Sequence, residues 1–202
     1  KVFEHQTSDF LTLLNLWEQY RHEEERLGEG ALRGGCREHF VSAVRMREWS
    51  QTWWQLREMA EELELRGVSG GGLPSEDRVH RALLTGLIAN VCCKDEALGA
   101  HEYRGFKGNV VSLFPGSVLF KKNPRWVMAA EVVETSRLYA RTLARIEPAW
   151  VEELAGHVMQ RQLSDKHYDA ERAEACVWER VSMNGVVVVP RRKASLSPLD
   201  AK

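Results

Sequence analysis

The sequence predicts an α+β protein in which a helical half is followed by a strand-rich half. Over the first 92 residues, apolar side chains recur at steps of three and four, which is the period of a helix. From about residue 97 the chain changes to short runs rich in valine and aromatic residues, separated by turn signals. Apolar residues make up 44% of the 202 residues, enough for a packed core in one large or two small domains.

The first expected helix covers residues 7–26. Thr7, Ser8 or Asp9 supplies its N-cap, because each carries a side-chain oxygen that accepts from a free N–H of the first turn. The polar run HEEERLGEG that follows ends in glycines and predicts the end of the helix and a loop. The apolar positions of this helix are Phe10, Leu13, Leu14, Leu16, Trp17 and Tyr20.

Residues 36–65 form one or two further helices. Gly34 and Gly35 are poor helix formers, so we expect the next helix to begin after them. Large aromatic side chains on these helices are expected to lie in the core rather than to bind a cofactor. They are Trp17, Phe40, Trp49, Trp53 and Trp54. Because Trp53 and Trp54 are adjacent, one of the pair is expected to be less buried on a helix.

A glycine-rich stretch, RGVSGGGLPSED over residues 66–77, is the clearest linker in the chain. It ends in Pro74-Ser75-Glu76-Asp77, which is a good helix start. We therefore expect a helix over 76–92.

The second half contains two turn signals. Pro115-Gly116 interrupts VVSLFPGSVLF, and Asn184-Gly185 divides ACVWERVSMNGVVVVPRRK into two strands of a hairpin. Between them, RWVMAAEVVETS is ambiguous, because Ala and Glu favour a helix while Trp and Val favour a strand. EPAWVEELAGHVM predicts a short helix with Pro148 in its first turn.

No catalytic or metal-binding motif is present. The sequence has no phosphate-binding loop, no H-E-x-x-H and no C-x-x-C, and its seven histidines are scattered. We expect no catalytic residues, no metal and no cofactor in this chain. The four cysteines (Cys36, Cys92, Cys93 and Cys176) fit small buried residues in a reducing cytoplasm.

The sequence gives no sign of a membrane partner. No apolar run approaches the ~18 residues that span a bilayer, and no signal peptide is recognisable. The chain opens within a pattern and without an initiator Met, so we expect a piece of a longer protein.

Positive charge is concentrated in one segment. Residues 101–146 carry eight lysines and arginines against three acidic residues, whereas residues 1–67 carry nine against thirteen. Within TSRLYARTLARIEPAW, Arg137, Arg141 and Arg145 are four apart and share a face on either a helix or a strand. A solvated face of mixed charge is the alternative, in which Arg125 and Arg145 pair with Glu131 or Glu147.

Aromatic residues alternate with these cations, and that combination suits single-stranded nucleic acid. Cations follow the phosphates while rings stack on the bases, often on a small five-stranded barrel. The predicted nucleic-acid-binding residues are Arg104, Lys107, Lys121, Lys122, Arg137, Tyr139, Arg141 and Arg145.

Several stretches resemble the C-terminal accessory region of DEAH-box ATP-dependent RNA helicases. They are HQTSDFLTLLNLWEQY, CREHFVSAVRMREW, HRALLTGLIANV and, most specifically, residues 111–156. The tail HYDAERAEACVWERVSMNGVVVVPRRK is similar to the bacterial HrpA-like branch.

The resemblance implies a helical ratchet-like domain over 1–93, an oligonucleotide/oligosaccharide-binding (OB) barrel over 94–160 and a β-rich, hairpin-containing extension over 161–202. It implies that RWVMAAEVVETS and SRLYARTLARI are barrel strands. The implied partners are single-stranded RNA and RecA-like motor domains, which carry ATP and Mg and are absent from this chain. The alternative is a docking module for the motor, an activator protein or a ribosomal surface.

Overall fold

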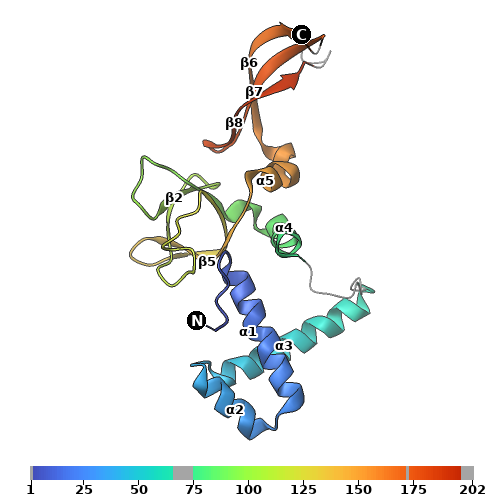
Figure 1. Ribbon diagram of the computed structural model, residues 1–202, viewed down its shortest axis with the longest axis vertical. Helices are drawn as coiled ribbons and strands as arrows, with labels where there is room; N and C mark the ends of the chain where they lie inside the picture. Colours follow the sequence, from blue (N-terminus) through green and yellow to red (C-terminus); the bar gives the residue numbers. More distant parts are fainter. Residues whose placement is uncertain (1, 66–74, 172, 197–202) are drawn as a thin grey trace. The chain divides into compact units, whose positions relative to one another are not determined.

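The computed structural model describes residues 2–65, 75–171 and 173–196 (Figure 1). They form two compact units. One contains residues 2–3 and 12–65, and the other contains residues 4–11 and 75–196. The first is helical and the second holds all the described strands, so the predicted α+β class is confirmed. The predicted linker over 66–77 lies mostly outside the described residues.

Three helices build the first unit around an aromatic core. They are α1 (Asp9–Arg26), α2 (Glu29–Glu38) and α3 (Ala43–Glu62). Trp17 lies at the centre, with its ring centroid 5.0 Å from that of Trp49. The guanidinium of Arg21 lies over the ring of Trp53 at 5.1 Å. Tyr20, Cys36 and Met46 complete the buried cluster.

Two expectations for this unit are wrong. Helix α2 includes Gly34 and Gly35, which were expected to precede the helix. A Cβ on Gly35 would come 2.9 Å from a carboxylate oxygen of Glu23, at the flexible end of that side chain. Phe40, expected in the core, is 98% exposed because the chain turns there through a positive φ of 57°. Trp54 is about half exposed while Trp53 packs against the core, in agreement with the expectation for this adjacent pair.

The second unit contains a closed five-stranded barrel with the order β1-β2-β3-β5-β4. Only β3 and β5 run parallel. The ambiguous segment RWVMAAEVVETS is therefore strand. Cys92, Tyr103, Leu113, Val127 and Leu143 lie in the buried cluster inside the barrel. The strands are β1 (Val91–Lys94), β2 (Glu102–Gly105), β3 (Val110–Leu113), β4 (Trp126–Glu134) and β5 (Leu138–Arg145).

Helix α4 (Glu76–Leu87) precedes the barrel and is shorter than expected. The predicted helix ran to residue 92, but a 3₁₀ turn (Ile88–Asn90) ends it and β1 begins at Val91. Cys92 is paired with Gly105 of β2 and with Val127 of β4. This pairing makes the segment a strand in spite of its helical periodicity. Residues 75–93, assigned to the helical domain from the sequence, thus belong to the barrel unit.

A three-stranded antiparallel sheet follows α5 (Pro148–Ala155) and a 3₁₀ turn (Gly156–Val158). The predicted hairpin is confirmed, with Asn184 and Gly185 both at positive φ. The buried Glu179 carboxylate accepts from Arg161 and Arg192, and Arg192 also binds Glu152 of α5. The strands are β6 (Gln160–Asp169), β7 (Glu174–Met183) and β8 (Val186–Ser195).

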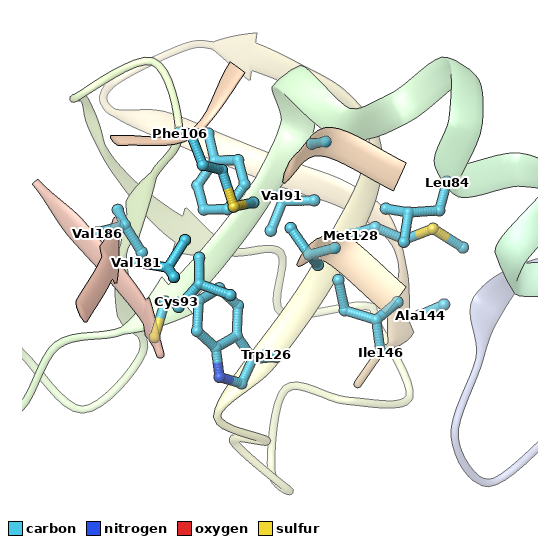
Figure 2. Close-up of a cluster of buried hydrophobic side chains, with 14 residues drawn as sticks. Leu84, Val91, Cys93, Phe106, Trp126, Met128, Ala144, Ile146, Val181 and Val186 are labelled. Carbon is cyan, nitrogen blue, oxygen red and sulfur yellow. The ribbon is translucent and has the colours of Figure 1, made fainter. Parts of the chain in front are cut away.

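The hairpin end of this sheet packs on the outside of the barrel. Figure 2 shows Val181 and Val186 of the sheet with Cys93, Phe106 and Trp126 of the barrel, in one buried cluster. The side-chain amide of Asn184, at the hairpin tip, donates to the backbone carbonyl of Phe106. The hairpin is therefore held against the barrel by apolar contact and by a hydrogen bond.

The alternation of inward- and outward-pointing side chains along β5 is interrupted at Thr142, and this interruption is called the reset below. This residue has a φ of 53°, unusual for a β-branched side chain. Ala140 and Leu143 both lie inside the barrel although they are three apart, whereas Arg141 between them is exposed. The β4–β5 register is the same on both sides of the reset. Residues 7–9 cover β5 beyond it, where the N–H of Leu143 donates to Asp9 and the N–H of Arg145 donates to the Thr7 carbonyl.

His80 of α4 is buried in this unit, and its protonation is expected to make the stability of the unit pH-dependent. Its side chain is 3% exposed, and its Nε2 lies 2.8 Å from the Ser8 hydroxyl. Burial lowers its pKa from the ordinary value of 6.5; His5 also lowers it, while Glu76 and Asp77 raise it. Because the unfolded chain takes up the proton first, we expect the free energy of unfolding to fall as the pH drops below about 6.5.

Urea unfolding of the wild type and His80→Gln between pH 5 and 8 measures this effect. The glutamine variant is expected to lose the pH-dependent part. The exposed His157→Gln should retain it, and an unchanged pH profile in His80→Gln would contradict the assignment.

Candidate nucleic-acid interface

The outer face of β5 presents an aromatic and cationic cluster. Alternation before the reset turns Leu138 and Ala140 toward the barrel interior, so that Tyr139 and Arg141 point outward. Phe114, just after β3, meets Tyr139 edge to face with 6.1 Å between ring centroids. The Arg141 guanidinium lies 4.6 Å from the centroid of the Phe114 ring. Phe114, Tyr139 and Arg141, together with Arg137, are called the strand face below.

The carboxylates near the strand face form only weak pairs with its arginines. Arg141 is 3.8 Å from Glu131, its cross-strand partner, and Arg137 is 3.8 Å from Glu102 of β2. Both pairs are long and solvent-exposed, and pairs of this kind contribute little free energy. The two guanidinium groups therefore remain available to an anion.

Arg145 does not share this face. The expectation that Arg137, Arg141 and Arg145 line one side of a strand is wrong, because the reset at Thr142 lies between Arg141 and Arg145. Arg145 instead donates to Glu147 at 2.8 Å and lines a hollow with Lys122.

The remaining predicted cations are spread over other parts of the barrel. Lys121 and Lys122 lie in the β3–β4 connection, where the Lys122 ammonium donates to the carbonyl of Gln6. Arg104 of β2 binds Asp95 at 2.8 Å, and this hydrogen bond holds the pKa of the Asp95 carboxyl below its ordinary value. Lys107, in the β2–β3 turn, donates to Asn90. The structure thus brings Arg137, Tyr139 and Arg141 together and leaves the other five predicted residues outside that group.

Two cations were missed by the site prediction. Arg125 and Lys94 line hollows beside the β7–β8 hairpin. Arg125 belongs to the basic segment, and the alternative reading paired Arg125 and Arg145 with Glu131 or Glu147. Glu147 does pair with Arg145, whereas Glu131 pairs with Arg141. Lys94 lies outside the basic segment, and only the pairing of β1 with β2 and β4 brings it close.

The thiols are buried and unreactive. Burial raises the pKa of Cys92 to about 12, and it also raises the pKa of Cys36, Cys93 and Cys176. Over the described ranges, no three His, Cys, Asp or Glu side chains gather in a way that would hold a metal ion. The same part of the chain has no helix with both the length and the apolar character needed to cross a bilayer.

A closed barrel with an exposed aromatic and cationic strand is the architecture of OB-fold domains. The family model described as "Oligonucleotide/oligosaccharide-binding (OB)-fold" matches residues 79–158, which contain most of α4 and all five barrel strands. The barrel is therefore an OB-fold domain.

Three relatives extend the comparison beyond the barrel. The chain is 40% identical over 98% of its length to the ATP-dependent RNA helicase HrpA of Escherichia coli, and 35% identical over 98% to the HrpA homolog of Haemophilus influenzae. It is 32% identical over 80% of its length to the human probable ATP-dependent RNA helicase DHX35. These matches span 15%, 15% and 22% of the respective relatives. The chain is therefore similar to a region of DEAH-box ATP-dependent RNA helicases, and the HrpA-like branch matches it over nearly its whole length.

Proposed function

We propose that this chain is an accessory segment that binds single-stranded RNA and holds it for helicase motor domains located elsewhere in the parent protein. The strand face carries the proposal. Tyr139 and Phe114 offer rings to bases, and Arg137 and Arg141 offer guanidinium groups to phosphates. Hydrolysis of ATP, with its Mg, belongs to those motor domains, and the proposed location is the cytoplasm.

Binding of a short RNA tests this function directly. Anisotropy of a labelled single-stranded RNA of ~12 nucleotides, titrated with the 202-residue chain, is expected to show micromolar affinity at low salt. The logarithm of the affinity should fall by about 0.7 per contacted phosphate for each tenfold rise in salt. If no binding is seen at low salt, the chain does not hold RNA by itself and the proposal fails.

A second candidate function is docking to protein, and the helical unit favours it. Several large apolar side chains of this unit are exposed: Phe40, Val44, Leu56, Met59 and Leu63. Exposed apolar patches often mark protein interfaces. The motor domains of the parent protein are the proposed partner, and a titration of isolated motor domains that gave no complex would count against it.

A further inference from the structure

Two hollows flank Arg125 on the side of the barrel covered by the β7–β8 hairpin. One, of about 510 Å³, is lined by Lys94, Arg104 and Arg125 together with Gly185–Val187 of the hairpin. The other, of about 650 Å³, is lined by Lys122, Arg125 and Arg145 together with Val188 and Pro190. Arg125 lines both, and successive hairpin residues form a wall of each. The two hollows together are called the hairpin groove.

The hairpin wall is fixed in place. Val186 (Figure 2) and Val188 are buried in the cluster that joins the sheet to the barrel, and Asn184 is hydrogen-bonded to the Phe106 carbonyl. Val187, between the two buried valines, lines the groove. A ligand would therefore meet a preformed wall, which lowers the entropic cost of binding.

The groove carries an excess of positive charge. Five cations and three carboxylates line it. Two of the carboxylates form ion pairs with lining cations, Asp95 with Arg104 and Glu147 with Arg145. Glu96 is the third. Within the described residues, neither Lys94 nor Arg125 forms an ion pair. The Arg125 guanidinium lies beside the Cys93 thiol and keeps further N–H donors for an anion.

The lining suits a sugar–phosphate backbone rather than bases. Its one aromatic residue is Trp126, which is 6% exposed and packed edge to face on Phe106. No open ring is offered for stacking by the lining residues, in contrast to the strand face. Besides the charged groups, the walls are mostly apolar and include three valines and three prolines. Cations on an otherwise apolar wall bind phosphates without reading the base sequence.

We infer that the hairpin groove binds the sugar–phosphate backbone of single-stranded RNA, with Arg125 as its central phosphate ligand. This inference rests on the proposed function and adds a second contact surface to it. Strand β5 connects the two surfaces: Arg141 lies on the strand face and Arg145 in the groove, about 13 Å further along at ~3.3 Å per residue.

The test compares two probes of ~12 units, a single-stranded RNA and an abasic strand with the same phosphodiester backbone. In the 202-residue chain, Arg125→Glu is expected to weaken binding of both probes about tenfold and to lower the salt slope by about 0.7. Tyr139→Ala is expected to weaken binding of the RNA alone. Arg78→Glu is the matched control, because Arg78 is exposed on α4 and lies outside both surfaces.

A second variant, Val187→Glu, places a negative charge in the groove without removing a cation. It is expected to weaken binding of both probes. If Arg125→Glu lowers the midpoint of thermal unfolding, Val187→Glu replaces it as the test of the groove. If both groove variants bound RNA with wild-type affinity while Arg137→Glu/Arg141→Glu lost binding, the groove would not be an RNA-binding surface. The proposed function would then remain intact. If the groove variants weakened binding of the RNA but not of the abasic strand, the groove would not be binding the sugar–phosphate backbone. Absence of RNA binding by the wild type would overturn both proposals.

Discussion

Arg137→Glu/Arg141→Glu, made together, is expected to reduce affinity for single-stranded RNA by about 100-fold or more at low salt. Each change removes a guanidinium from the strand face and puts a carboxylate where a phosphate would bind. The change at position 141 also removes the cation from the Phe114 ring, and the carboxylate that replaces it would face Glu131 across the strand pair. The residual binding should depend less steeply on salt, because fewer counterions are released.

The control for this reversal is a variant with the same change of charge elsewhere. Arg57→Glu/Arg78→Glu alters net charge equally at two exposed positions on α3 and α4. Anisotropy titrations at two salt concentrations compare the pair, and circular dichroism checks that both remain folded. Equal affinity of the two double variants would show that the strand face is not the RNA-binding surface.

Asp9→Ala is expected to lower the free energy of unfolding of the barrel unit by about 2–4 kcal/mol. One carboxylate oxygen accepts the N–H of Leu143 at 2.8 Å, and the other accepts the N–H of Val118 at 3.0 Å. Alanine would leave both backbone donors without a partner in a partly buried site. An unsatisfied buried donor costs about 1–3 kcal/mol, and two are involved.

Urea unfolding followed by tryptophan fluorescence measures this loss, with Asp77→Ala as the control. Asp77 is also an acidic residue in the first turn of a helix, but it is exposed on α4. Its removal costs only the interaction with the helix dipole, about 0.3–1 kcal/mol. If the two variants were equally stable, the carboxylate of Asp9 would not be what ties residues 7–9 to β5.

Some elements could be predicted from the sequence, because they depend on local pattern. Helical spacing predicted α1, and Asn184-Gly185 predicted the hairpin between β7 and β8. Periodicity did not decide whether residues 125–136 are strand, since Ala129, Ala130 and Glu131 favour a helix. Only the resemblance to a known family indicated the barrel, and pairing with β1 and β5 makes the segment a strand.

The candidate site was less predictable, because it depends on backbone geometry that residue spacing does not report. A positive φ at Thr142 separates Arg141 from Arg145, and nothing in the identity of a threonine predicts it. The hairpin groove combines Arg125 with the hairpin residues 185–190, which lie far along the chain from it. No local pattern links such segments, so Lys94 and Arg125 were not among the predicted site residues.

The barrel unit is a discontinuous domain, since residues 4–11 belong to it although the helical unit separates them from residues 75–196. Asp9 and Thr7 supply acceptors for β5, and Ser8 forms a bridge with Ala144. A fragment that starts at residue 75 would therefore lack part of its own fold. A single cut between residues 65 and 75 would instead leave two pieces that complement each other, because the N-terminal piece keeps the segment that completes the barrel.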